Sequence, residues 1–334
     1  MKISASLYSN KNNNIIDTVK ELDAYKIDCY HIDCNDDLNV FSDIETINKI
    51  SDTPIDLHII SDNPEKFYSH IINNNIRYIT FQYENLNKKL EIPKEVQSKV
   101  GIAITSSTDI NIFEEYKDIC SHILFMTTIP GVSGGEFNKD TFKKIRQFRQ
   151  KYPDKKIHVD GGINEELSFI MRNMGIYLVV TGSFLFKQNY IGSALLQMKS
   201  NDIKSKYLVK DFMLQYDEIP VISEQNYTFY DVLKSIDDFR MGFTIIADSD
   251  KKVKGIISSA DIRRLLIKNI NDLNAIDVNE MINKNPAYAY EEDSVSILLE
   301  KIKNLNFPVL FMPVINENKQ ITGTIKFNNL VKGE

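Results

Sequence analysis

The sequence lacks several features that mark whole classes of protein. It has only three cysteines, an odd number with no CxxC spacing, which predicts neither a disulfide framework nor a zinc knuckle. It has no apolar run close to the roughly 18 residues that span a bilayer. Its first residues lack the apolar core and the cleavage site of a signal peptide. We therefore expect a cytoplasmic protein with reduced cysteines and no membrane partner.

An excess of positive charge is also missing. Lys and Arg number 40 against 46 Asp and Glu, for a net charge of -6. This balance favours solubility and disfavours attraction to phosphate backbones, so nucleic acid is not an expected partner. What the chain does have is length and apolar content. Its 334 residues, 43% of them apolar, provide material for two domain cores.

Eight β-rich runs alternate with amphipathic stretches in the first part of the chain. Apolar residues between the runs recur at helical spacing, as in Ile15, Val19 and Leu22. Such strand–helix units predict an α/β fold, a (β/α)8 TIM barrel, over residues 1–198. An open doubly wound sheet is the alternative, because counting strands does not prove closure. The expected strands are Ile3–Tyr8, Cys29–Cys34, Ile55–Ile60, Tyr78–Tyr83, Val100–Thr105, Ile123–Thr127, Ile157–Asp160 and Leu178–Thr181.

A second domain is expected after a polar linker at residues 199–206. The tail, residues 207–334, divides into two copies, 207–270 and 276–334. The residue pattern of each copy predicts an extended entry segment, a helix, two short strands and a closing helix. Either copy is too small to bury a core of its own, so we expect the two copies to pack on each other.

Recurring segments identify the tail as an internal duplication. Val209–Met213 recurs as Val278–Ile282, and Gly255–Ser258 recurs as Gly323–Lys326. The separation is almost the same for the two pairs, which is the signature of a repeated structural unit. The tail is therefore predicted to hold two similar α+β halves.

Four side chains able to bind a metal ion lie at the ends of predicted strands. His31 and Asp33 share one face of the second strand, because residues i and i+2 do so. His58 lies near the C-terminal end of the third strand and Asp160 at that of the seventh, and such strand ends form the catalytic face of a barrel. Two imidazoles and two carboxylates suit one Zn²⁺, Fe²⁺ or Mn²⁺ ion. The alternative is that each is a satisfied polar residue of the barrel interior.

Glycine is scarce in the sequence but concentrated in the loops that follow the last predicted strands. Seven of the 13 glycines lie between Gly131 and Gly182. Loops after strands seven and eight are where such barrels bind phosphate, through backbone N–H groups that approach the anion closely. Tight turns are the alternative use of these glycines. The candidate anion-binding residues are Gly131, Gly134, Gly135, Gly161, Gly162, Gly182 and Ser183.

Several short motifs occur in a fixed order along residues 1–190. They are Ile3–Leu7, His31–Asp33, Asp56–Ile59 with Asn63–Glu65, Met126–Thr127 with Pro130–Gly131, Val159–Asn164 and Gly182–Ser183. In this order they resemble the ribulose-phosphate 3-epimerase family. The resemblance implies a (β/α)8 barrel, one divalent metal ion and a phosphorylated ketose as substrate.

The resemblance also implies roles for individual residues. The metal ligands would be His31, Asp33, His58 and Asp160. Asp33 and Asp160 would in addition be the catalytic acid and base. Ser6 matches a substrate-contacting serine of the first strand, and Met126 belongs to a substrate-side motif.

The chain departs from the family's pattern around the substrate. Asn35–Asp37 follow the second-strand motif where Met-Asp-Gly is usual. Ile60 replaces a methionine, Gln82 replaces a histidine, and residues 132–135 read Val-Ser-Gly-Gly instead of Phe-Gly-Gly-Gln. We expect D-ribulose 5-phosphate and D-xylulose 5-phosphate as the substrate pair. Another ketose phosphate, such as a 2-ketohexose 6-phosphate, and a non-catalytic sugar-phosphate sensor are the alternatives.

The tail carries a second resemblance over residues 207–333. Its motifs are Asp217–Pro220, Met241–Gly242, Gly255–Ser258 and Asp261–Arg264. They resemble a CBS domain pair, particularly the pair that ends arabinose 5-phosphate isomerases. The resemblance implies a nucleotide site at Ser258 and Asp261, whereas the second copy has Lys326 and Asn329. A regulatory nucleotide site and a dimerisation module both remain open, and we expect a homo-oligomer.

Overall fold

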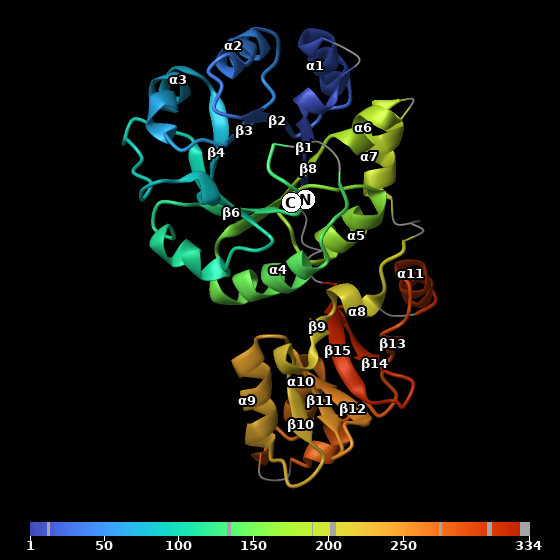
Figure 1. Cartoon of the computed structure of the whole chain (residues 1–334). Helices are drawn as coiled ribbons and strands as arrows, with labels where there is room; N and C mark the ends of the chain where they lie inside the picture. The colour runs from blue at the N-terminus through green and yellow to red at the C-terminus, as the bar shows by residue number, and fades with distance from the viewer. Residues whose placement is uncertain are drawn as a thin grey trace. The chain divides into compact units, whose positions relative to one another are not determined.

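The structure is a computed structural model, and the chain divides into two compact units, Met1–Ile203 and Lys204–Gly333. The first unit is a barrel and the second is a tail of two similar halves (Figure 1). Within the described part of the chain, no helix combines the length and the apolar character needed to cross a bilayer. The structure describes residues 1–11, 14–131, 135–188, 190–200, 205–273, 276–305 and 309–327.

Eight parallel strands form a closed barrel in the order of the chain. The last strand pairs with the first, with Ser4 opposite Val180. This closure confirms the predicted barrel, and the alternative of an open sheet is wrong. The strands are β1 (Lys2–Ser6), β2 (Cys29–Cys34), β3 (Ile55–Ile59), β4 (Ile76–Gln82), β5 (Lys99–Thr105), β6 (His122–Met126), β7 (Lys156–Asp160) and β8 (Leu178–Thr181).

Helices surround the barrel with their apolar faces buried, as Val19 and Leu22 illustrate (Figure 1). After β4 and β5, short 3₁₀ turns at Tyr83–Asn85 and Ile110–Glu115 stand where the strand–helix pattern predicts α-helices. The segment between β4 and β5 contains Pro93, which cannot donate the backbone hydrogen bond of a helix interior. The helices are α1 (Ile15–Ala24), α2 (Val40–Ile50), α3 (Tyr68–Asn73), α4 (Asp140–Lys151), α5 (Glu165–Asn173), α6 (Ser183–Lys187) and α7 (Ile191–Lys199).

The tail contains two sheets with the same internal order. In each sheet a short strand pairs in parallel with a middle strand, which pairs antiparallel with a third. The antiparallel pairs shift register at corresponding points, Ile246/Ala247 and Val314/Ile315. The strands are β10 (Val221–Ser223), β11 (Phe243–Ala247) and β12 (Val253–Ser258), and β13 (Ala289–Tyr290), β14 (Phe311–Ile315) and β15 (Ile321–Lys326). The repeated topology agrees with the predicted duplication and adds one short strand to each copy.

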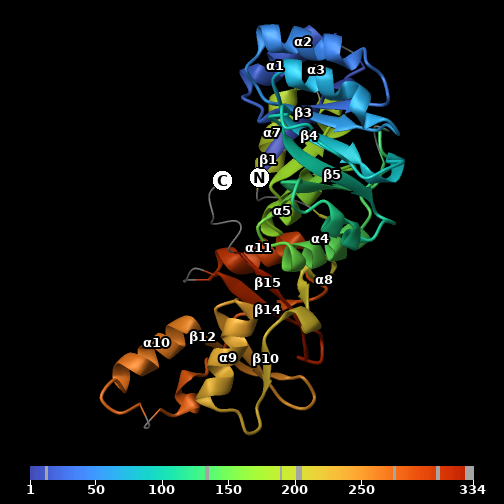
Figure 2. The same ribbon diagram turned by 90° about the vertical axis from the view of Figure 1, so that its left-hand side faces the viewer.

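The described part of the tail contains four helices, of which α9 and α10 pack on the first sheet. α9 and α10 lie beside β10 and β12 in Figure 2. Thr228, Ser258 and Ser294 cap the N-termini of α9, α10 and α11 through side-chain hydrogen bonds, which explains where these helices begin. The closing helix predicted for the second copy lies outside the described residues. The helices are α8 (Val209–Phe212), α9 (Phe229–Phe239), α10 (Ser259–Lys268) and α11 (Val295–Lys303).

The two copies of the tail exchange their entry segments. β9 (Leu214–Gln215), from the start of the first copy, pairs antiparallel with β15 of the second. The corresponding Asn283 of the second copy bridges to Ile256 in β12 of the first. Between the copies the equivalent rings of Phe243 and Phe311 stack, with centroids 3.7 Å apart. The prediction that the copies pack on each other is therefore confirmed, and neither sheet is complete alone.

Two histidines from neighbouring strands stack inside the barrel. The rings of His122, which begins β6, and His158 in β7 have centroids 4.1 Å apart. His122 Nε2 lies 2.9 Å from Thr80 Oγ1, whereas His158 Nε2 has no hydrogen-bond partner in the described part of the chain. Burial, only partly offset by Asp56, lowers the pKa of His122 to about 4. Burial and the neighbouring His122 also hold the pKa of His158 well below its ordinary value. Both rings are thus neutral packing groups at neutral pH.

We expect the variant His158→Phe to make the stability of the protein less dependent on acid pH. Because the folded-state pKa is lowered, only the unfolded chain takes up this proton as the pH falls below 6.5, and the wild type loses stability there. The variant should remove up to about 1.4 kcal/mol per pH unit from this slope. Urea unfolding of both proteins, followed by circular dichroism across the acid range, checks the prediction. Equal slopes would contradict it.

Candidate metal centre and substrate pocket

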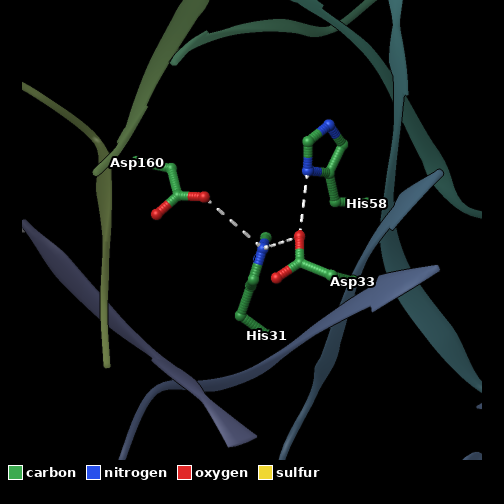
Figure 3. A group of neighbouring side chains, drawn as sticks. All are labelled: His31, Asp33, His58 and Asp160. Atoms are coloured by element: carbon green, nitrogen blue, oxygen red, sulfur yellow. Dashed lines mark hydrogen bonds and ion pairs between the residues drawn. The ribbon is translucent and has the colours of Figure 1, made fainter. Parts of the chain in front are cut away.

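The ends of three barrel strands bring four side chains together. His31 and Asp33 come from β2, His58 from β3 and Asp160 from β7, and we call these four residues the His/Asp cluster (Figure 3). One potential ligand atom from each lies within 4.8 Å of all the others. Asp33 Oδ1 is 3.3 Å from His31 Nε2 and 3.2 Å from His58 Nδ1. Asp160 Oδ2 lies 3.8 Å from His31 Nε2, on the other side of that ring.

Each histidine of the cluster is held from outside by a second acceptor. Asp56 Oδ2 lies 2.9 Å from His31 Nδ1 and also accepts a hydrogen bond from Ser4 Oγ at 3.1 Å. On the other ring, His58 Nε2 lies 2.9 Å from Gln82 Oε1. One nitrogen of each ring is therefore anchored, and the other faces the cluster. This is the arrangement typical of metal-binding histidines.

Burial and charge act in opposite directions on the cluster. Burial lowers the pKa of His31, but the carboxylates of Asp33 and Asp56 outweigh it and raise the pKa well above its ordinary value. Burial raises the pKa of Asp33, but its contacts with His31 and His58 leave that pKa well below its usual range. For Asp160, burial and the neighbouring carboxylate of Asp33 raise the pKa to about 6 against the opposing effect of His31 and His58. The two carboxylates thus differ in proton affinity.

The donor set of the cluster fits a divalent metal ion. Two imidazole nitrogens and two carboxylates match the ligand preferences of Zn²⁺, Fe²⁺ and Mn²⁺. No lysine or arginine is among the described residues that line the pocket beside Asp33 and Asp160. A bound cation would supply the positive charge that two converging buried carboxylates require.

A pocket opens above the cluster and contains most of the predicted substrate-side residues. Of these, Gly135 is not in the lining, and Gly134 lies outside the described residues. Tyr8, Ser9, Asn35 and Thr128 also line the pocket, which the sequence reasoning missed. The predicted residues that line it are Ser6, Asp33, Met126, Gly131, Asp160, Gly161, Gly162, Gly182 and Ser183.

Two glycines of the pocket are required by close contacts. A Cβ atom on Gly161, which has a positive φ of 107°, would lie 2.4 Å from Thr128 Oγ1. A Cβ atom on Gly182 would lie 2.1 Å from Ser9 Oγ. These two loops bring backbone and hydroxyl groups to the end of the pocket that follows β7 and β8. Such an end can accept an anionic group.

Asp56, Gln82 and Glu84 are parts of the site that the sequence reasoning did not assign. Asp56 lies two residues before His58 and therefore shares its face of β3, which was an available signal. Gln82 ends β4, at the same end of the barrel as the cluster. Glu84 follows in a 3₁₀ turn, so strand periodicity could not place its side chain.

The predicted nucleotide-binding residues of the tail form a helix cap. Ser258 caps α10. Asp261 Oδ2 accepts hydrogen bonds from the backbone N of Ser258 at 2.9 Å and from Ser258 Oγ. Asp261 also pairs with Arg264. Both side chains therefore have a structural role in this conformation. Lys326 ends β15 at the corresponding place, and Asn329 lies outside the described residues.

The fold and the His/Asp cluster define a class of protein: barrel enzymes with a candidate metal centre at the carboxyl ends of their strands. The chain belongs to the ribulose-phosphate 3 epimerase family, whose model matches residues 2–186. Epimerases are isomerases, which places this chain in that class of enzymes.

Curated relatives agree with the family assignment. Ribulose-phosphate 3-epimerase of Bacillus subtilis is 23% identical over 60% of this chain and 99% of its own length. The enzyme of the same name from Methanocaldococcus jannaschii is 26% identical over 64% of this chain and 95% of its own. That from Chlamydia muridarum is 31% identical over 44% of this chain and 69% of its own.

Solved structures similar to this chain include CBS domain proteins. One is CBSX2 in complex with AMP, 19% identical, which covers 38% of this chain and 94% of its own at a TM-score of 0.32. Another is a CBS domain pair in complex with 5-methylthioadenosine and S-adenosyl-L-methionine, 22% identical, covering 38% of this chain and 94% of its own at a TM-score of 0.32.

We expect the variant His58→Ala to purify with little Zn²⁺, Fe²⁺ or Mn²⁺. Losing one of four ligands weakens a metal site severely, while the strands around it can stay folded. Elemental analysis of the purified proteins measures the metal content. The matched control is His70→Ala, because His70 packs on Phe41 outside the cluster and should leave the metal content unchanged. Full metal content in His58→Ala would mean that the cluster is only barrel packing.

Proposed function

We propose that this protein is a metal-dependent ketose-phosphate 3-epimerase that interconverts D-ribulose 5-phosphate and D-xylulose 5-phosphate. The observation that carries the proposal is the convergence of two carboxylates and two histidines beside a pocket with an anion-accepting end. Membership of the epimerase family supports the reaction type. The named relatives support the pentose phosphate pair.

The proposed mechanism depends on two carboxylates that approach the pocket from different strands. Inverting C3 requires removal of a proton next to the C2 carbonyl and return of a proton to the opposite face. Asp33 from β2 and Asp160 from β7 both line the pocket and serve as this acid and base pair. Their unequal proton affinities suit a pair in which one carboxylate removes a proton while the other donates one.

The His/Asp cluster would hold the divalent ion. When bound, the ion supplies Lewis-acid stabilisation of the negative charge that develops on the substrate oxygens. His31 and His58 keep their ligand nitrogens toward the cluster through the outer contacts with Asp56 and Gln82. Met126, buried at the end of β6, gives the pocket an apolar wall.

The anion-accepting end of the pocket would bind the phosphate. Gly161 and Gly162 follow β7, and Gly182 and Ser183 follow β8. The hydroxyl groups of Ser6 and Ser9, whose oxygens are 3.0 Å apart, lie at the same end. A phosphate held by amide and hydroxyl donors orients C3 toward the two carboxylates and needs no lysine or arginine.

A longer sugar is the second candidate substrate, and one residue supports it. Asn35 lines the pocket with its side-chain oxygen near Gly131, and its amide makes no hydrogen bond to another described residue. An unused amide can bind an additional hydroxyl group, such as one of a 2-ketohexose 6-phosphate. A non-catalytic sensor is less well supported, because sensing requires no pair of carboxylates for proton transfer.

We expect Asp33→Asn and Asp160→Asn each to reduce epimerisation by at least about 1,000-fold, because each removes an acid–base group. A coupled assay of purified protein supplied with Zn²⁺, Fe²⁺ or Mn²⁺ measures this with D-ribulose 5-phosphate. Near wild-type turnover in either variant, with metal still bound, would exclude the two-carboxylate scheme.

The same assay with a panel of ketose phosphates identifies the substrate. The pentose phosphate should have the highest kcat/KM. A higher value for a 2-ketohexose 6-phosphate that falls in Asn35→Ala would favour the second candidate. Binding of a sugar phosphate without turnover of any member of the panel would favour the sensor.

We propose that the tail, if it binds a nucleotide, does so mainly through its first copy. Ser258 can donate to a phosphate and Asp261 can accept from ribose hydroxyls, whereas Lys326 offers only a point charge. Calorimetric titration with adenine and cytidine nucleotides should give at most one tight site per chain. Asp261→Ala should abolish it, and Asn329→Ala should change it little. Two equal sites would overturn the assignment, and an absence of binding would favour a dimerisation module.

A further inference from the structure

A chain of hydrogen bonds leads from the cluster to the loop after β5. His58 Nε2 lies 2.9 Å from Gln82 Oε1, and Gln82 Nε2 donates to Glu84. Glu84 Oε1 accepts from the backbone N of Thr105 at 2.9 Å and from its Oγ1 at 3.0 Å. The chain connects side chains from β3, β4 and β5.

The direction of these hydrogen bonds is determined by their outer end. An ionised carboxylate can only accept, so the amide nitrogen of Gln82 must face Glu84 and its oxygen must face His58. An amide oxygen can only accept in turn, so His58 carries a proton on Nε2. The other nitrogen, Nδ1, faces Asp33 at 3.2 Å and can offer its lone pair to a cation in the cluster.

Glu84 is itself held as an ionised acceptor. Burial raises its pKa, but hydrogen bonds from Thr105, Thr108 and Gln82 outweigh burial and lower the pKa. It makes no ion pair with another described residue. Lys144 of α4 instead donates to the backbone carbonyl of Thr108, in the same loop. Glu84 therefore accepts from Gln82 as an ionised carboxylate, and this contact keeps the amide oxygen of Gln82 toward His58.

We propose that Gln82 and Glu84 are positioning residues for His58: they select its Nε2–H tautomer and its ring orientation, so that Nδ1 is presented to the metal ion. The inference rests on the proposed metal site. The two histidines of the cluster are then held differently. His31 has a carboxylate, Asp56, in direct contact, whereas His58 reaches its carboxylate through a neutral amide. Outer contacts of this kind contribute to both the geometry and the affinity of a metal site.

Metal affinity and the tautomer of His58 together test this proposal. The affinity for Zn²⁺ is measured by competition with a chelator, and the tautomer by ¹⁵N NMR of histidine-labelled, zinc-loaded protein. We expect Gln82→Leu to weaken zinc binding by about 10- to 100-fold and Glu84→Gln by a smaller factor. Glu115→Gln, which neutralises an exposed glutamate elsewhere on the barrel, is the matched control and should not change the affinity.

A paired exchange separates positioning from general damage to the fold. The double variant Gln82→Glu/Glu84→Gln places a carboxylate directly beside His58 and an amide behind it. It should recover zinc affinity relative to Gln82→Leu and show the Nε2–H tautomer. The proposal is overturned if both single variants bind zinc as tightly as the wild type, or if zinc-loaded wild type has the proton of His58 on Nδ1. Weak zinc binding by the wild type itself would instead overturn the metal site of the proposed function.

Discussion

Closure of the barrel is the constraint on which the site depends. Asp33 comes from the second strand and Asp160 from the seventh, and in an open sheet of the same strand order they would lie near opposite edges. Pairing of β1 with β8 brings these strands around one axis. The carboxylates then lie on two sides of His31, with its Nε2 3.3 Å from Asp33 and 3.8 Å from Asp160. A set of residues distributed over more than 120 positions of the chain thereby becomes one cluster.

Burying several ionisable groups together removes them from water, and hydrogen bonds from the surrounding residues offset this loss of solvation. Burial alone disfavours the ionised form of a carboxylate and of a histidine. Around the cluster, Asp56 and Ser4 support one imidazole and Gln82 and Glu84 the other. The two histidines deeper in the barrel, His122 and His158, have no carboxylate within hydrogen-bond distance among the described residues and are neutral there. His31, whose pKa Asp33 and Asp56 raise, thus differs in charge from His122 and His158 because its neighbours differ.

In the tail, each half is too small to bury a hydrophobic core of its own, and the two halves share one instead. Each half gives its entry segment to the sheet of the other, through β9 on β15 and through Asn283 on β12. The stacked rings of Phe243 and Phe311, at equivalent positions, lie in the core between the halves. This exchange explains why the duplicated motifs begin before α9 in the first copy and before α11 in the second.

The sequence by itself determined the strand order, the four residues of the cluster and the duplication of the tail. These depend on local periodicity and on short motifs, which a linear pattern preserves. Only the tertiary structure decided closure, the outer contacts of Asp56, Gln82 and Glu84, and the place of Asn35 in the pocket. It also replaced two expected helices by 3₁₀ turns. These features arise from contacts between distant strands and loops, and the spacing of residues along a chain carries little information about such contacts.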